Sequence, residues 1–379
     1  LTILVSLGAA WLLFSCADER HTMERVLEQA DSLLTNYPDS ALLLLDSELA
    51  KENSDSHYSN QLRLRRLNAI NKLDTFFTSS HVRQAQSLAD HFNQQGSPNE
   101  CLLAYYLLGR TYTDTGEAPQ AIDSYQKAID AVDTTQADCD YHQLAIVYGQ
   151  MANLLYHQNL YHDGLRCLDQ AIRYSYLADD TLSALLGYSQ KIDCFAMLQE
   201  PDSVLIISET VSALFQRLGY PQEAAAVLAL PVKYLIEQGE YMKARRYMDI
   251  YEKESGFFDA DHQIEQGREV YYYTKGRYFL ALCQYDSAEC YFRKELSLGH
   301  DFNNQNAGAR GLALLFRQIH QPDSATKYAL YSYAMNDSAY NHESTSEVAR
   351  WEALYNYSRY EHQAQKEKQR ADHNRWLLS

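Results

Sequence analysis

A chain of 379 residues that is 46% hydrophobic and 22% charged can bury a core, so its composition excludes an intrinsically disordered chain. Its net charge of −17, from 33 basic and 50 acidic residues, repels phosphate backbones and argues against general nucleic-acid binding. Only 7 Pro and 15 Gly are present, and no run alternates apolar and polar residues between turn signals. The sequence therefore predicts helices and no β-sheet.

Residues 1–16 are predicted to be an export signal. Residues 1–14 are almost wholly apolar, and at about 1.5 Å per residue they give only ~21 Å of helix, too short for a ~30 Å hydrocarbon layer. The first residue is not Met and no basic region precedes the apolar run, so we expect a clipped N-terminus. Leu13-Phe14-Ser15-Cys16 resembles a bacterial lipobox, and we expect Cys16 to be lipidated. An ordinary signal peptide with an incidental Cys is the alternative.

Residues 22–95 predict two degenerate helical hairpins, over 22–50 and 57–95. The second helix of the first hairpin begins with the motif Pro38-Asp39-Ser40-Ala41, and the same or a very similar motif occurs at residues 201–204, 285–288 and 322–325. Proline stops the preceding turn, and we expect the Asp or Ser side chain to accept hydrogen bonds from the free amides of the new helix.

Residues 96–338 predict six further hairpins. The clearest repeat starts at Leu102 and carries Tyr105, Leu108, Gly109, Tyr112, Gly116, Ala121, Tyr125 and Ala128. We expect Gly109 and Ala121 to let two helices approach closely, with Tyr125 filling the space beside them. A small residue recurs in each second helix, at 41, 85, 121, 164, 204, 244, 288 and 325, with a mean spacing of about 41 residues. Longer loops near 133–140 and 256–262 take up part of the extra length.

Residues 339–379 are predicted to continue beyond the repeats as an extended helix or weak coiled coil. Val348, Trp351, Leu354 and Tyr355 give one last apolar face, and the sequence beyond Tyr360 is polar. The final residues 376–379, Trp-Leu-Leu-Ser, are interpreted as the start of a truncated membrane-spanning segment. A natural C-terminus with an exposed Trp is the alternative.

The repeated pattern resembles the tetratricopeptide-repeat (TPR) superfamily over roughly residues 22–338, with longer repeats than the 34 residues typical of that class. It is most similar to bacterial envelope members with a lipoprotein-type leader and "PDSA" helix starts. The resemblance implies an all-α, right-handed TPR-like superhelical solenoid of about eight helix hairpins, followed by the C-terminal extended helix.

The sequence shows no catalytic constellation. It contains no Gly-rich phosphate loop, no H-E-x-x-H and no G-x-S-x-G, and its Cys residues have neither C-x-x-C nor zinc-finger spacing. We therefore expect a protein that is not an enzyme and that needs no cofactor or metal.

In the TPR superfamily, positions 5, 9 and 12 of each first helix line the concave face, and one predicted first helix carries Ala229, Lys233 and Ile236 in this way. The resemblance gives a candidate groove made of Tyr106, Arg110, Asn153, Tyr156, Lys233, Tyr273, Arg277, Arg310 and Arg317. Asp193 is its one acid. A basic strip in an acidic chain suits an extended ligand with carboxylates, such as an acidic peptide. The alternative is that these cations pair with acids on neighbouring helices.

We therefore predict a non-enzymatic protein- or peptide-interaction scaffold in the bacterial cell envelope, on its extracytoplasmic side. A lipid on Cys16, the C-terminal helix, or both would anchor it to a membrane. The alternative is the extracytoplasmic sensor domain of a membrane-spanning regulator, which would bind a peptide or glycan. Direct glycan capture is a third interpretation, suggested only by the 31 Tyr residues.

Overall fold

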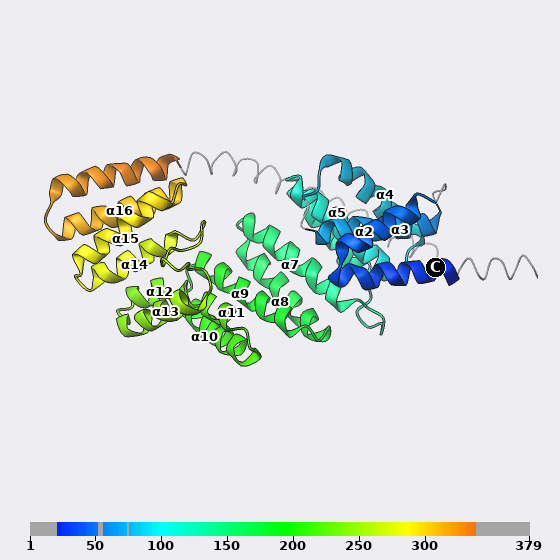
Figure 1. Cartoon of the computed structure of the whole chain (residues 1–379), viewed down its shortest axis with the longest axis horizontal. Coiled ribbons are helices and arrows are strands. Elements are labelled where there is room, and N and C mark those ends of the chain that lie inside the picture. The colour runs from blue at the N-terminus through cyan, green and yellow to red at the C-terminus, as the bar shows by residue number, and fades with distance from the viewer. Residues whose placement is uncertain (1–20, 52–55, 74–75, 339–379) are drawn as a thin grey trace, which may run out of the picture. The chain divides into compact units, whose positions relative to one another are not determined.

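The computed structural model describes residues 21–51, 56–73 and 76–338 (Figure 1). Cys16, the predicted signal segment and the predicted tail over 339–379 lie outside this part of the chain. The described residues form two compact units, one ending at Leu154 and one starting at Leu155. The boundary falls within α7 (Tyr141–His157).

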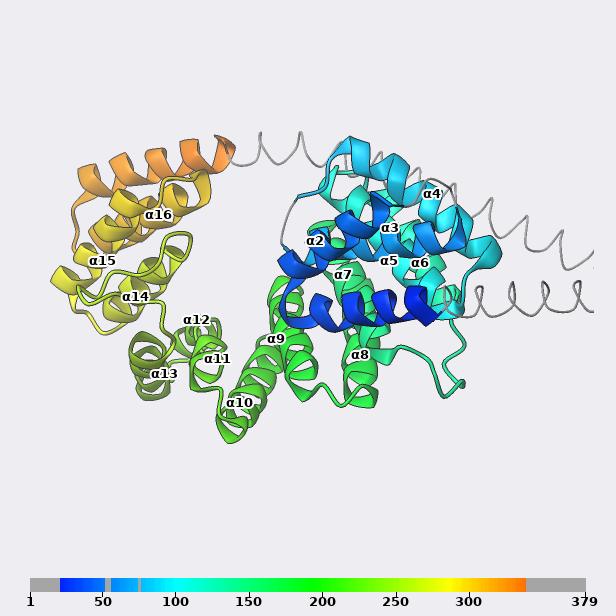
Figure 2. The same cartoon turned by 45° about the vertical axis from the view of Figure 1, so that its right-hand side comes forward.

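Both units consist of consecutive helix–turn–helix pairs (Figures 1 and 2). The first unit contains a helix over 21–36, α2 (Pro38–Leu49), α3 (His57–Lys72), α4 (Ser79–Gln95), α5 (Pro98–Asp114), α6 (Ala118–Asp130) and most of α7. The second contains α8 (Tyr161–Leu177), α9 (Thr181–Met197), α10 (Pro201–Leu218), α11 (Pro221–Ala226), α12 (Pro231–Glu237), α13 (Tyr241–Glu254), α14 (Val270–Ala281), α15 (Tyr285–Leu298), α16 (Phe302–Gln318) and a helix over 322–338. Taken in order, the described helices make eight hairpins.

The predicted all-α repeat solenoid is thereby confirmed. Across the described ranges there is no β-sheet, and Phe258 and Ile264 form an isolated antiparallel bridge. No helix in this part of the chain combines the length and the apolar character needed to cross a membrane.

Small residues hold the two helices of a hairpin close together, as the sequence predicts. A Cβ atom placed on Gly109 of α5 would lie 2.4 Å from the ring of Tyr125 on α6, a distance that real Cβ atoms do not reach. Gly276 of α14 meets the ring of Phe292 on α15 in the same way, at 2.5 Å. Each pair lets one aromatic ring fill the space beside a bare backbone, so the steric role predicted for these residue types is confirmed.

One turn recurs at five helix connections between α7 and α13. A residue with positive φ ends the helix at Asn159, Asp179, Gln199, Gly219 and Gly239, which makes a constant interval of 20 residues. The next residue then donates its backbone N–H to a carbonyl five positions earlier, as Leu160 does to Leu155 at 2.9 Å and Glu200 to Phe195 at 3.0 Å. This hydrogen bond satisfies one of the free carbonyls at the helix end.

The positions of the helix starts correct one prediction. The N-cap residues of α2, α10 and α15 make no side-chain capping bond. Asp39, Asp202 and Asp286 accept no hydrogen bond within the described residues, so the expected capping by these Asp side chains is wrong. Each helix begins one residue before its Asp, which places the carboxylate inside the first turn. There its negative charge interacts favourably with the positive N-terminal end of the helix dipole.

The first helix of the sixth hairpin is broken into α11 and α12. Pro231 lacks the amide that a continuous helix needs and its ring clashes with the preceding turn, so residues 227–230 form turns. Ala229 lies in this break, and the expectation that it shares one helix with Lys233 and Ile236 is wrong.

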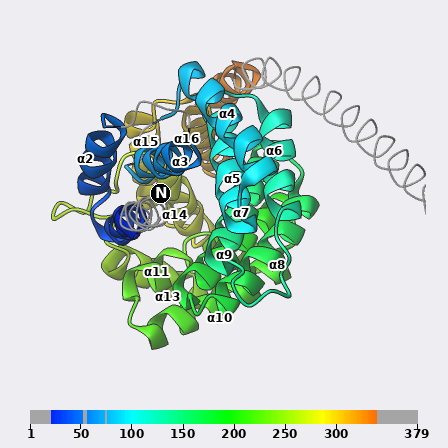
Figure 3. The same cartoon turned by 90° about the vertical axis from the view of Figure 1, so that its right-hand side faces the viewer.

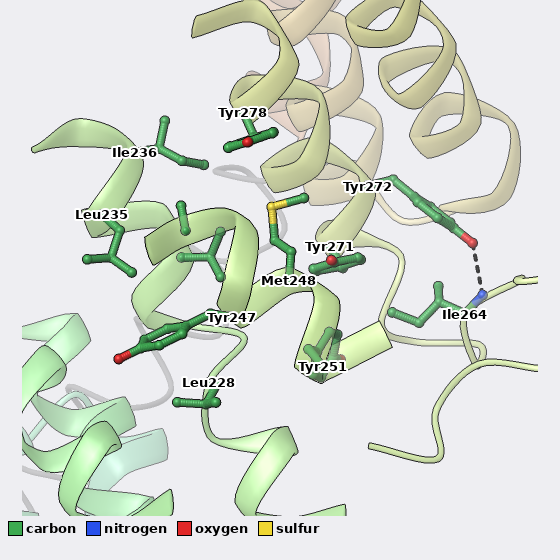
Figure 4. Packing of buried hydrophobic residues seen from close by; sticks show 12 residues of the cluster. Leu228, Leu235, Ile236, Tyr247, Met248, Tyr251, Ile264, Tyr271, Tyr272 and Tyr278 are labelled. Atoms are coloured by element: carbon green, nitrogen blue, oxygen red, sulfur yellow. Dashed lines mark hydrogen bonds between the residues drawn. The ribbon is translucent and has the colours of Figure 1, made fainter. Parts of the chain in front are cut away.

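Aromatic packing dominates the centre of the second unit (Figure 4). Tyr251 and Tyr271 have ring centroids 4.9 Å apart, and both pack with Met248. The Tyr272 hydroxyl accepts a hydrogen bond of 2.8 Å from the backbone N–H of Ile264, which ties the long loop over 255–269 to α14. Part of the high tyrosine content is therefore core packing.

Candidate functional site

A pocket of about 800 Å³ opens on the second unit. Its walls come from the first helices of four consecutive hairpins, α9, α11–α12, α14 and α16, and from the end of the loop before α14. Figure 3 shows α9 and α14 nearer the middle of the view than α8 and α10. The inner helices also touch one another, since α12 contacts α14 and α14 contacts α16.

Four cations line this pocket, and two of them have no anionic partner among the described residues. Arg277 Nη1 lies 3.1 Å from Glu237 Oε1 on the neighbouring hairpin. Arg268 Nε lies 3.3 Å from Glu265 Oε2, and its guanidinium stacks 3.6 Å above the centre of the Phe257 ring.

Lys233 and Arg310 are the two cations that lack an anion. Within the described residues neither makes an ion pair or a hydrogen bond, and both side chains are exposed. Lys233 Nζ lies 5.1 Å from the centre of the Tyr234 ring, a contact that leaves its donors free. The pocket therefore presents two uncompensated positive charges in a chain whose net charge is −17.

Asp193 is an acid in the same pocket, and it too has no partner in the described part of the chain. Its side chain is exposed, yet the protein atoms around it desolvate the carboxylate and raise the pKa of the carboxyl above the ordinary value. No cation is among the causes of the shift, so Lys233 and the arginines do not compensate this charge.

The remaining walls are apolar or aromatic. Ile192 and Ile236 are buried beside the pocket, as are Tyr251 and Tyr271. Tyr273 is half-buried and packs on Phe292, with ring centroids 5.9 Å apart. An apolar floor with a few charged groups at defined places is typical of a ligand site.

The structure brings together four of the residues predicted for the groove: Lys233, Tyr273, Arg277 and Arg310. Arg317 lines an adjoining hollow of about 590 Å³ that shares Arg277 with the main pocket. Tyr156 belongs to the same unit but does not line either cavity, and it packs edge-on against Tyr161 with centroids 5.5 Å apart.

The other three predicted groove residues lie in the first unit. Arg110 Nη2 is 3.3 Å from Asp114 Oδ1, and the guanidinium also donates to Asn71. Tyr106 is only 5% exposed and stacks against Tyr125, so its ring fills the interior of this unit.

Asn153, also in the first unit, is exposed. Within the described residues, pairing with an acid on a neighbouring helix, the alternative considered for the predicted cations, thus describes Arg277 but not Lys233 or Arg310, and Arg110 pairs with an acid on its own helix.

Counting helix positions did not find Arg268, Glu237 or Tyr251, which also line the pocket. Arg268 comes from the loop before α14, outside the repeat register, so spacing carries no signal for it. Among the described residues no group of three His, Cys, Asp or Glu side chains is placed to hold a metal ion.

Comparisons with known proteins give structural likeness only. Neither a protein-family model nor a curated protein matches the chain. The apo form of the quorum sensor NprR from B. thuringiensis is similar with a TM-score of 0.51 and 11% identity, covering 84% of this chain and 99% of that one. A tetratricopeptide repeat protein from Parabacteroides merdae gives 0.41 and 13%, covering 78% and 99%. Cut9 of the APC/C hetero-tetramer Cut9–Hcn1 gives 0.46 and 13%, covering 88% and 55%.

Identities this low bear on the fold alone. The structural likeness to NprR, the eight hairpins and the close glycine–aromatic contacts in two of them show that this chain has a tetratricopeptide-type helical-repeat fold.

Proposed function

We propose that this chain is a non-enzymatic binding protein, and that the pocket of its second unit takes an extended peptide segment through the carboxylates of that segment. The observation that carries the proposal is the pair of cations without anionic partners, Lys233 and Arg310, in one pocket of an acidic chain. A carboxylate that meets such a cation forms a charge-assisted hydrogen bond, which is stronger than one between neutral groups.

The fold supports the same role. First helices of stacked hairpins form an extended surface. Such a surface suits an extended binding partner better than it suits a reaction that needs an enclosed pocket. Scaffold and sensor share this fold, so the fold does not separate them. NprR, which is similar in structure, is described as a quorum sensor, and this is a property of NprR alone.

Charge reversal tests the pocket. The probe is a pool of nonapeptides with four Glu at varied positions and fluorescein on an internal Lys side chain, and the matched pool carries Gln instead of Glu. We expect the Glu pool to bind more tightly than the Gln pool in fluorescence anisotropy, and increasing salt to weaken this preference. The Lys233→Glu, Arg310→Glu double variant should lose it.

The control is Arg217→Glu with Lys253→Glu, which makes the same change in net charge. Both residues are exposed on second helices, lie outside the pocket and make no ion pair within the described residues. Equal binding of the two pools, no binding of the Glu pool, or equal loss in the control variant would show that the pocket does not bind carboxylates.

We further propose, from the sequence of residues 1–16, that the chain is exported and lipidated on Cys16 in a bacterial envelope. In that case Cys16→Ala should move the protein from the membrane to the soluble fraction. Unchanged membrane association of this variant would instead assign the anchor to the C-terminal side. Coding sequence beyond Ser379 for a membrane helix and an output domain would favour the sensor, and a stop codon there would favour the scaffold.

A further inference from the structure

The pocket contains an acid that its own cations leave unpaired. Two acids line it, and Glu237 is paired with Arg277, whereas Asp193 makes no ion pair or hydrogen bond in the described part of the chain. Holding a partly desolvated carboxylate without a partner costs free energy. A group supplied by the ligand would recover it.

Resting on the proposed function, we propose that the pocket fixes the direction of the bound peptide. The free amino end lies at Asp193 on α9, and the carboxylates lie toward Lys233 and Arg310 on α12 and α16. The α-amino group of a peptide is protonated near neutral pH and offers three donors to one carboxylate. It is therefore the complement of Asp193.

The order of the helices makes Asp193 a terminal position. α9 is the first of the four inner helices that line the pocket, and α16 is the last. A group that meets Asp193 is thus at one end of the ligand, and a group that meets Arg310 is at the other. This separation of signs distinguishes a directed site from an evenly basic one.

The same helix order limits the length of the ligand. Packed helices lie 8–10 Å apart, which applies to the steps from α12 to α14 and from α14 to α16. Taking the same spacing for the step from α9 to α12 gives a span of about 30 Å. An extended chain advances about 3.3 Å per residue, so a peptide of up to roughly nine residues reaches from Asp193 to Arg310.

Desolvation by the surrounding protein supports the assignment of Asp193. It raises the pKa of the carboxyl, and no positive group of the protein opposes this shift. An ammonium brought by the ligand would favour the ionised form and lower the pKa again.

Acetylation of the peptide end tests the direction. The probes are the Glu-containing nonapeptide pool with a free amino end and the same pool with that end acetylated. For the parent protein we expect acetylation to weaken binding about tenfold, since it removes one charge-assisted hydrogen bond. In Asp193→Asn, acetylation should make no further difference.

Asp179→Asn is the matched control, because Asp179 lies in the turn before α9, outside the pocket, and Asn tolerates its positive φ. This variant should discriminate between the two pools as the parent does. The comparison of the two pools on the parent alone needs no variant and is independent of any folding defect.

The outcomes separate the two proposals. If both pools bind the parent equally well, or if Asp193→Asn still discriminates between them, the direction is wrong while carboxylate binding stands. A peptide cation other than the amino end is then indicated if acetylated peptides containing an unlabelled Lys bind best. If neither pool binds the parent, both proposals are overturned.

Discussion

Glu295 on α15 is a carboxyl group with 0% of its surface exposed, and its replacement by Gln tests how the second unit responds to pH. Oε2 accepts a hydrogen bond of 3.3 Å from the backbone N–H of Tyr273, and Oε1 has no partner in the described part of the chain. Burial, together with the charges of Glu269 at the start of α14 and Asp301 at the start of α16, raises the pKa of Glu295 to about 8.

The sign follows from the protons bound in each state. The pKa of a Glu is near 4.5 when unperturbed, so between about pH 4.5 and 8 the folded chain holds a proton that the unfolded chain has released. Stability therefore falls as pH rises through this range. At 1.36 kcal/mol per pH unit, the difference between 4.5 and about 8 corresponds to a loss of roughly 5 kcal/mol at most.

Glu295→Gln keeps the size and hydrogen-bonding capacity of the protonated acid and cannot ionise. Its free energy of unfolding should lie within about 1 kcal/mol of the parent at pH 5 and exceed the parent by several kcal/mol at pH 8.5. Urea unfolding followed by far-UV circular dichroism measures the difference at each pH, so that the other titrating groups cancel. Because repeat arrays can unfold in parts, hydrogen exchange in α14–α16 should be read in parallel.

Glu289→Gln, on the same helix, is the matched control. Glu289 is partly exposed and pairs with Arg293 at 2.7 Å, so its replacement should show only a small and nearly constant difference. A Glu295→Gln variant whose advantage over the parent does not grow between pH 5 and 8.5 would refute the reasoning, since it would mean that Glu295 is not the group that holds the proton.

Three further predictions concern packing, the loop and the ligand site. Gly109→Ala should destabilise the fold by about 1–3 kcal/mol, because the added Cβ atom would clash with the ring of Tyr125. Gly149→Ala, whose Cβ atom would meet nothing within 4 Å, should stabilise α7 by up to about 1 kcal/mol. Thermal unfolding that ranks the two variants in the opposite order would contradict the described packing. Tyr272→Phe should lower the free energy of unfolding by about 1–3 kcal/mol, because it leaves the buried N–H of Ile264 without a partner. Hydrogen exchange should increase first in the loop over 255–269, and unchanged exchange there would show that the hydroxyl does not hold the loop. The preference for free over acetylated peptide ends should decline as pH falls through the raised pKa of Asp193, and this decline should start above pH 3.8, the ordinary pKa of an Asp. If fluorescence anisotropy shows a constant preference down to pH 3.8, Asp193 does not belong to the site.

The sequence by itself determined the repeat architecture. Gly109 with Tyr125 and Gly276 with Phe292 are readable as pairs because close helix packing requires a bare backbone opposite a ring. Helix starts at Pro38 and Pro201 are equally local, since proline suits the first helical position. The predictions on Cys16, the tail and the envelope concern residues outside the described ranges and stay predictions.

Only the tertiary structure decided which charges are free. Arg277 and Lys233 look alike in the sequence, yet Arg277 meets Glu237 forty residues away and Lys233 meets no acid within the described part of the chain. The loop that brings Arg268 to the pocket and the break at Pro231 also lie outside the repeat register. Repeat spacing fixes which backbones pack together, whereas ion pairing depends on side chains at variable positions of neighbouring hairpins, and their meeting is set by the packed structure.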